Sequence, residues 1–231
     1  MRMKIYFKKQ NDELLPFDHQ EYVSKYFYSI LKKMKSKYPF VDHLNKMTNY
    51  TFSYIMSNQR EVLKDGIRIN GEPYIIVSSP NEKFLRFFTN GLYEYPNLKV
   101  GNLKLKVENI NIMNKENPNG KQLTLLSPLV LKKKVGNKIW FILPEHEDFN
   151  KILEEKLRKR YKMFYENDAP ADPLIIKFKE IKTKRHKVFG KYYRGCLGKL
   201  YLSGNPELVK FAYDSGIGEN TNYGFGLLET V

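Results

Sequence analysis

The chain has 231 residues and carries 40 Lys and Arg against 25 Asp and Glu, a formal net charge of +15 at pH 7. This length allows one large domain or two of about 100 residues each, and an apolar content of 42% excludes a disordered chain. The charge favours a polyanionic partner. The single cysteine, Cys196, excludes an internal disulfide and a cysteine-based zinc site. No apolar run approaches the length of a membrane span, so we expect a soluble, cytoplasmic protein without a membrane partner.

The first half alternates strand-like and helix-like patterns. A basic strand is expected at 3–8, followed by a helix at 18–37 whose apolar residues recur at helical spacing and whose N-cap is Asp18. Further elements are expected in chain order: strands at 50–57, 66–69 and 74–78, a helix at 81–93 and a strand at 103–112. Apart from the extra short strand, this order is β-α-β-β-α-β.

A polar segment with Pro and Gly at 114–120 predicts a linker. Beyond it the same order recurs: strands at 123–134 and 138–142, a helix at 147–165, strands at 174–184 and 188–203, a helix at 205–215 and a final strand at 225–231. We therefore predict an α+β fold of two tandem ferredoxin-like (RRM-like) β-α-β-β-α-β domains, at 1–115 and 121–231.

The most basic stretch of the chain is 177–199, with nine cations, one acid and interleaved aromatics. Lysine and arginine that neutralise phosphates release counterions, so such a hairpin could supply much of a nucleic-acid affinity. A solvated hairpin tip is the alternative interpretation. A second basic cluster at 156–162 is equally well explained as a solvated helix face. The candidate nucleic-acid-binding cations are Lys182, Lys184, Arg185, Lys187, Lys191 and Arg194.

Four of the fourteen glycines fall at 216–226, between an apolar helix-like run and the last strand. Glycine tolerates positive φ and lets backbone N–H groups approach a ligand, so we expect a row of donors suited to phosphate. A helix C-cap and a β-bulge are the alternative explanation. The spacing is not that of a P-loop. The candidate residues for contact with the phosphates of a nucleic acid are Gly216, Gly218, Asn222, Gly224 and Gly226.

Catalytic candidates are few. None of the four histidines has metal-ligand spacing to another histidine or to the cysteine, and no paired carboxylates suit a two-metal site. We therefore expect no metal and no cofactor. An enzyme of this kind would act on a substrate that carries its own nucleophile, and RNA does so through its 2′-OH.

His43 and Lys46 lie in a loop-like stretch after the first helix. An imidazole can take or give a proton at cellular pH, and a lysine three residues on could stabilise phosphate charge. On a helical wheel Tyr28 projects away from the apolar stripe, beside lysines that attract phosphate. The alternatives are a surface histidine and an ordinary exposed tyrosine.

The glycine spacing carries a family resemblance. Gly216-Ile217-Gly218, five residues, then Gly224-Phe225-Gly226 fit G-h-G-x(5)-G-h-G, where h is apolar. This pattern before the last strand resembles the CRISPR repeat-RNA endoribonucleases of the Cas-six family. Weaker similarities are His19-Gln20 at the first helix, Tyr50-Thr51-Phe52-Ser53, and Leu126-Ser127-Pro128.

The resemblance implies two tandem ferredoxin-like domains and metal-independent cleavage by 2′-OH attack, giving 2′,3′-cyclic phosphate and 5′-OH ends. It implies catalytic roles for His43, Tyr28 and Lys46, of which Tyr28 aligns best. The implied partner is CRISPR repeat RNA (precursor crRNA), with CRISPR effector subunits and a second copy of the chain as further candidates. Some members of the family only bind RNA, so a non-catalytic repeat-RNA-binding module is the alternative. A metal-dependent nuclease on the same scaffold is a second one.

Overall fold

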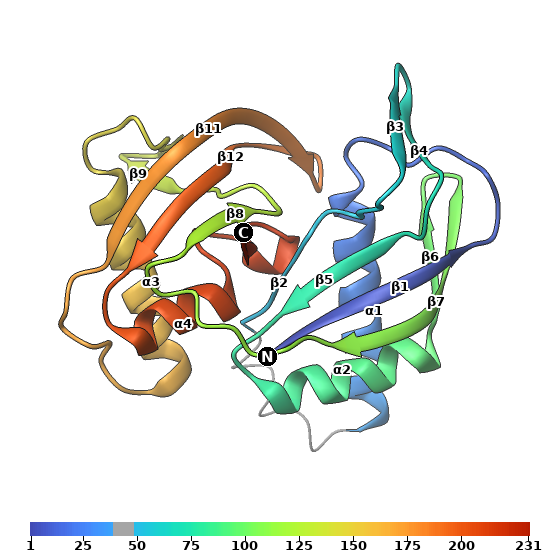
Figure 1. The fold of residues 1–231 in the computed structure, drawn as a ribbon, viewed down its shortest axis with the longest axis horizontal. Helices are drawn as coiled ribbons and strands as arrows, with labels where there is room; N and C mark the ends of the chain where they lie inside the picture. The colour runs from blue at the N-terminus through green and yellow to red at the C-terminus, as the bar shows by residue number, and fades with distance from the viewer. Residues whose placement is uncertain (39–48) are drawn as a thin grey trace.

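The computed structural model describes residues 1–38 and 49–231. In the N-terminal half a five-stranded antiparallel sheet has the order β2-β5-β1-β7-β6 (Figure 1). Its elements in chain order are β1 (Arg2–Lys9), α1 (Gln20–Lys37), β2 (Thr51–Phe52), β5 (Tyr74–Ser78), α2 (Glu82–Glu94), β6 (Asn97–Val100) and β7 (Leu103–Ile112). With β6 set aside as an edge addition, this is the strand order of a ferredoxin-like unit.

The C-terminal half repeats the arrangement with the strand order β11-β12-β8-β13. Its elements are β8 (Gln122–Leu125), α3 (Phe149–Tyr165), β11 (Ile175–Val188), β12 (Lys191–Ser203), α4 (Pro206–Ser215) and β13 (Leu228–Thr230). Two small hairpins stand apart from the sheets: β3 (Arg60–Leu63) with β4 (Gly66–Ile69), and β9 (Lys132–Val135) with β10 (Lys138–Phe141). The prediction of two tandem ferredoxin-like units is confirmed.

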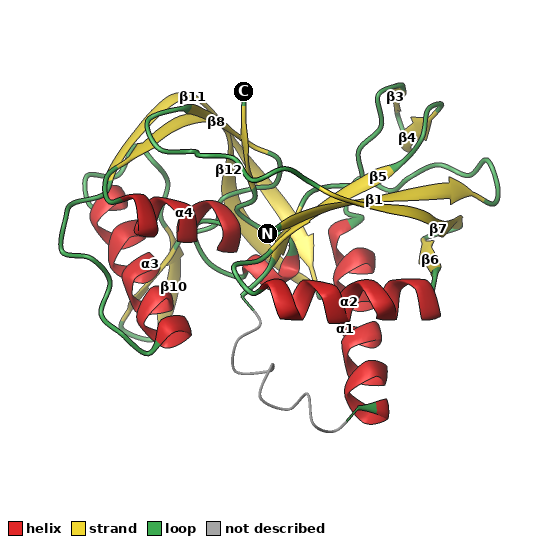
Figure 2. Cartoon of the chain, turned by 60° about the horizontal axis from the view of Figure 1, so that its bottom comes forward, coloured by secondary structure: helices red, strands yellow, loops and turns green. Residues whose placement is uncertain are grey.

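Helices cover one side of each sheet, and the opposite sides remain uncovered by helices (Figure 2). In α1 the buried side chains Val23, Phe27, Ile30 and Met34 follow the predicted apolar stripe. They belong to a core built from residues 3–107, whereas a second core draws on residues 123–228. Each half therefore buries its own apolar face.

Two expected strands are shorter than predicted. The segment 50–57 pairs as a strand only at Thr51–Phe52, because the Ser53 hydroxyl then accepts from the Ile76 amide and donates to the Tyr54 carbonyl. The strand expected at 123–134 is two strands, β8 and β9. Pro128 lies between them and has no N–H for a ladder bond.

Other boundaries also differ from the sequence prediction. His19, not Asp18, occupies the N-cap of α1, and its ring makes no capping bond. The long helix α3 begins at Phe149, and the last strand covers only Leu228–Thr230. The sequence analysis missed β3 and β6, which pair with β4 and β7. Cys196 is a buried free thiol.

None of the helices in the described residues is long and apolar enough to cross a membrane.

Candidate nucleic-acid interface

Residues 216–226, called the glycine loop below, require glycine on steric grounds. All four glycines are buried and have φ between +74° and +84°, which side-chain-bearing residues rarely adopt. A Cβ at Gly226 would lie 1.8 Å from the Ile217 carbonyl oxygen, and one at Gly218 would lie 2.5 Å from that of Val130. The backbone is therefore packed too closely for any side chain at these positions.

The glycine loop joins the two halves of the protein. Gln20 Nε2 donates to the Gly224 carbonyl at 2.7 Å. Thr51 Oγ1 donates to the Phe225 carbonyl at 2.8 Å. A Cβ at Gly224 would collide with the Phe52 ring and the Gln20 amide. These N-terminal residues belong to the His19-Gln20 and Tyr50–Ser53 segments that carried weaker family similarity, so the sequence contained a signal for this contact.

The expected row of free amide donors is wrong at two positions. Gly224 N–H donates to the Thr221 carbonyl, and Gly226 N–H donates to the Pro128 carbonyl, both at 2.8 Å. Tight packing satisfies these donors inside the protein. Contact of Gly216, Gly218, Gly224 and Gly226 with RNA stays a prediction, and Asn222 is an exposed side chain of the loop.

Arg160 forms hydrogen bonds to the backbone of the glycine loop. Its guanidinium donates to the carbonyls of Gly216 and Gly218 at 2.8 and 2.9 Å. Burial lowers the pKa of Arg160 to about 10, while nearby Glu219 opposes the shift. Arg158 forms a hydrogen-bonded ion pair with Glu154 on the same helix. The interpretation of the 156–162 cluster as a solvated helix face is therefore wrong for these two arginines, which stabilise local structure.

A pocket of about 330 Å³ opens where α1 meets the glycine loop. We call it the junction pocket; its lining residues are Ser24, Tyr28, Tyr50, Phe189, Asn222 and Tyr223. Tyr28 is 68% exposed, which confirms that it lies off the apolar stripe of α1. Phe189, at the tip of the β11–β12 hairpin, packs its ring 5.0 Å from that of Tyr223. Both halves of the chain therefore build this pocket.

His43 and Lys46 lie outside the described residues. Their catalytic roles stay predictions. In the described part of the lining, the junction pocket has three phenols (Tyr28, Tyr50 and Tyr223), a hydroxyl and an amide but no imidazole, ammonium or carboxylate group. Tyr28 is the one predicted catalytic residue whose surroundings can be stated.

The basic hairpin β11–β12 presents its cations on two faces. Lys182 pairs with Leu197 and Lys184 with Gly195, whereas Arg185 pairs with Arg194. Paired residues share a face and neighbours alternate, so the first two lysines lie opposite the two arginines. Arg185 also stacks over the Tyr192 ring at 4.5 Å. All six candidate cations, with Lys187 and Lys191 included, are exposed and form no ion pair with a described residue.

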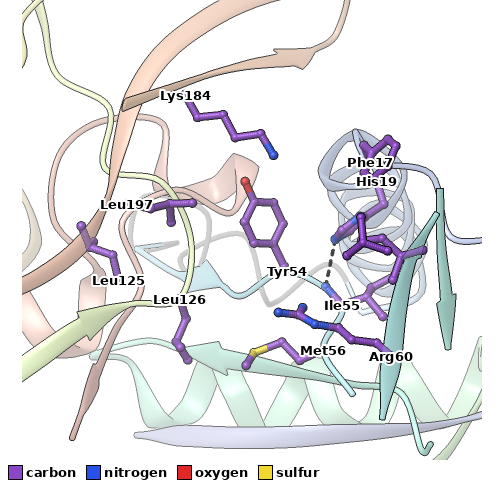
Figure 3. A pocket seen from close by; sticks show the side chains of 12 residues that line it. Phe17, His19, Tyr54, Ile55, Met56, Arg60, Leu125, Leu126, Lys184 and Leu197 are labelled. Carbon is purple, nitrogen blue, oxygen red and sulfur yellow. Dashed lines mark hydrogen bonds between the residues drawn. The ribbon is translucent and has the colours of Figure 1, made fainter. Parts of the chain in front are cut away.

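A second pocket of about 390 Å³, the cleft pocket, lies between the halves (Figure 3). Lys184 reaches toward it from the C-terminal sheet, and Arg60 from the N-terminal half. His19 lies at its edge and accepts through Nε2 from the Ile55 amide at 3.1 Å. The cleft pocket thus combines two cations with apolar walls.

Two histidines near the cleft pocket are buried and neutral. Burial lowers the pKa of His19 to about 4, and the Lys184 charge adds to the shift. Burial likewise lowers the pKa of His186 to about 4. His186 is 5% exposed and its Nδ1 is hydrogen-bonded to the Tyr54 hydroxyl at 3.0 Å. Although His186 lies near the tip of the basic β11–β12 hairpin, its ring points inward and packs on Phe225.

Within residues 1–38 and 49–231, no three His, Cys, Asp or Glu side chains gather as a metal site would require. The interface is a junction of two ferredoxin-like units, with exposed cations, aromatic rings and a packed glycine loop. This arrangement defines the class of tandem ferredoxin-like proteins with a basic cleft.

The family follows from comparison with known proteins. The family model described as CRISPR associated protein Cas6, C-terminal, matches residues 103–230, and the one described as CRISPR-associated protein Cas6, N-terminal, matches residues 14–111. The chain belongs to the Cas6 family.

Individual relatives agree over the full length. The chain is 30% identical to the CRISPR-associated endoribonuclease Cas6 1 of Methanocaldococcus jannaschii, over 100% of this chain and 93% of that protein. It is also 30% identical to a putative CRISPR-associated endoribonuclease-like protein, Cas6nc, of Pyrococcus horikoshii, over 96% and 95%.

Solved structures match equally well. One described as CRISPR associated protein Cas6 has a TM-score of 0.91 at 27% identity, covering 100% of this chain and 99% of that chain. Another, described as an RAMP protein binding different RNA substrates, has a TM-score of 0.89 at 29% identity with the same coverage.

Proposed function

We propose that this protein is a metal-independent endoribonuclease that cuts CRISPR repeat RNA by attack of a ribose 2′-OH on the adjacent phosphate. Membership of the Cas6 family and the endoribonuclease names of its relatives support RNA processing. The observation that carries the proposal is the exposed Tyr28 beside Asn222 and Tyr223, where α1 meets the glycine loop. A phenol at such a junction can hold or transfer a proton on bound RNA.

The step balances without an external reactant. The 2′-oxygen forms a bond to phosphorus as it loses its proton, and the bond from phosphorus to the 5′-oxygen breaks as that oxygen gains one. We propose His43 as the base or acid in this exchange and Tyr28 as its partner or as the group that orients the ribose. Lys46 would stabilise charge on the phosphate. The products are a 2′,3′-cyclic phosphate and a 5′-OH.

RNA binding in this proposal falls on the exposed cations of the β11–β12 hairpin and on Asn222. Lys182 and Lys184 face the cleft pocket side, while Arg185 and Arg194 share the opposite face. An RNA strand that contacts both faces would pass around the tip at Phe189 or over the edge strand β11. Association with CRISPR effector subunits or with a second copy of the chain remains part of the proposal.

A second candidate function is a non-catalytic repeat-RNA-binding module. The described lining of the junction pocket has one ionisable side-chain type, the tyrosine phenol, and one similar protein is named only endoribonuclease-like. This candidate predicts salt-sensitive binding without cleavage.

The test is incubation of the protein with repeat RNA in EDTA, followed by analysis of the product ends. The proposal predicts cleavage with a cyclic phosphate on one product and a 5′-OH on the other. Loss of cleavage in EDTA would replace it with the metal-dependent nuclease. Binding without cleavage in any buffer would favour the binding module.

A further inference from the structure

The β9–β10 hairpin is an addition to the ferredoxin-like order, placed between β8 and α3, and it forms a two-stranded sheet of its own (Figure 1). Its residues between Lys132 and Phe141 are all exposed. Trp140, the only tryptophan of the chain, is 58% exposed there, and Ile139 is 65% exposed. Neither side chain contributes to either core, so packing does not explain them.

The base of this hairpin is fixed to the glycine loop. The Lys132 amide donates to Glu219 Oε2 at 2.7 Å, and Lys132 Nζ donates to Asn220 Oδ1 at 2.6 Å. The Phe141 ring lies 6.0 Å from that of Tyr193, which lies 6.4 Å from that of Tyr223. Because Tyr223 lines the junction pocket, a short line of aromatic rings connects that pocket to the hairpin.

The hairpin is strongly cationic on both faces. Trp140 pairs with Lys133 and Ile139 with Lys134, so each exposed apolar side chain has a lysine directly beside it. Lys138 adds a further cation next to the turn, and residues 132–141 contain no acid. Lysines alone would protect an exposed strand edge from pairing. An exposed indole adds apolar surface to that edge and so favours association. Its presence among the lysines indicates a binding role.

We propose that the β9–β10 hairpin is a second RNA-binding site, where Trp140 stacks on a base and Lys133 and Lys138, which share its face of the hairpin, contact the flanking phosphates. Lys133 forms an exposed ion pair with Asp148 at 3.1 Å, and a phosphate would replace that carboxylate. The hairpin would hold the single-stranded part of the substrate RNA that leaves the junction pocket. This proposal rests on the proposed function. Aromatic rings beside cations are the usual platform for single-stranded nucleic acid. A protein partner fits less well, because the centres of protein interfaces are depleted in lysine.

Trp140 provides its own readout, since all tryptophan emission from this protein comes from that site. The full-length protein is titrated with oligouridylate and with the repeat RNA of a neighbouring array, while a fluorescein label on the RNA reports binding independently. The proposal predicts quenching of the emission that saturates together with the binding signal. RNA that binds without any change in emission overturns this site and leaves the proposed function standing. Failure of both RNAs to bind overturns both.

Substitutions at Trp140 and at two neighbouring lysines separate stacking from other roles. Trp140→Phe keeps a π face, whereas Trp140→Leu keeps only an apolar side chain. We expect Trp140→Leu to weaken binding by roughly 5- to 100-fold and Trp140→Phe to retain most of it. The pair Lys133→Ala and Lys138→Ala, on the Trp140 face, should weaken binding more than the pair Lys83→Ala and Lys99→Ala, which removes the same charge from α2 and β6. Equal binding by both tryptophan variants and the parent protein would instead assign the surface to a protein partner and overturn the proposal.

Discussion

The glycine loop and the tip of the β11–β12 hairpin meet at the junction pocket but are built in opposite ways. The loop has buried glycines whose amides at Gly224 and Gly226 bond to carbonyls. The hairpin has six exposed cations without an ion pair among the described residues. The backbone of the glycine loop can be built only from glycine at those four positions. The spacing of these glycines in the sequence is therefore a marker of the family. The hairpin side chains, in contrast, are free to contact a polyanion.

The sharpest way to test this contrast is a pair of glycine substitutions with nearly equal φ. Gly226 has φ +74° and Gly190, at the hairpin tip, has φ +71°. A Cβ would meet Ile217 at 1.8 Å in the first case and nothing within 4 Å in the second. We expect Gly226→Ala to cost about 4 kcal/mol of unfolding free energy and Gly190→Ala about 1–2 kcal/mol. Denaturant unfolding measures both, and equal costs would contradict the close packing of the glycine loop.

The pH dependence of stability tests the buried side of the junction. His19 and His186 have pKa values lowered to about 4, mainly by burial, against about 6.5 in the unfolded chain. Between these values the unfolded state binds protons that the folded state does not, so stability falls as the pH drops below about 6.5, by up to about 1.4 kcal/mol per unit for each histidine. Above about pH 6.5 these two histidines do not make the unfolding free energy depend on pH.

The measurement is the unfolding free energy from pH 7 to pH 4 for the parent protein and for His19→Gln and His186→Gln. Each variant should show a shallower fall, whatever its stability at neutral pH. His146→Gln is the comparison variant, since it removes an exposed ring in place of a buried one. Parallel curves for all four proteins would show that the buried rings titrate normally.

Tyr28→Phe tests the exposed side of the junction. Loss of the hydroxyl should slow single-turnover cleavage roughly 10²-fold, as for a positioned acid or base, while the dissociation constant for repeat RNA stays unchanged. Tyr22→Phe removes a hydroxyl from an exposed ring of the same helix and should change neither quantity. Equal rates for the two variants would remove Tyr28 from the mechanism.

The smallest effect is expected at the hairpin cations. Arg185→Ala and Lys187→Ala should each weaken RNA binding about fivefold. The slope of the logarithm of the binding constant against the logarithm of the salt concentration should become shallower by about one for every phosphate that is no longer neutralised. Lys83→Ala and Lys99→Ala, on α2 and β6, remove equal charge and should affect binding less. Equal weakening by the two pairs would mean that net charge, and not the hairpin, sets the affinity.

Much of this fold follows from local sequence. The periodic apolar stripe of α1 and the long alternating strands β11 and β12 predicted their own elements, and their order predicted two ferredoxin-like units. Strands β3 and β6 were missed because four residues carry little periodicity and their pairing depends on other segments. Pro128 indicates a break between two strands, but the apolar residues on both sides of it led to the prediction of one continuous strand.

The site was predicted less completely. The helical wheel placed Tyr28 at the surface because that argument needs only local geometry. The packing of Arg160 and of His186 was not predicted, because their neighbours in sequence are charged and the segments that pack on them are distant in the chain. Arg160 packs under the glycine loop, and His186 packs against Tyr54 and Phe225. No local pattern carries that information.

The central claim is that the RNA supplies the nucleophile. Its most direct test is repeat RNA with a single 2′-deoxy substitution at the nucleotide before the scissile phosphate, with cleavage measured in EDTA beside the unmodified RNA. The account predicts cleavage of the unmodified RNA, none of the substituted RNA, and equal binding of both. Cleavage of the 2′-deoxy RNA at the same phosphate would contradict it.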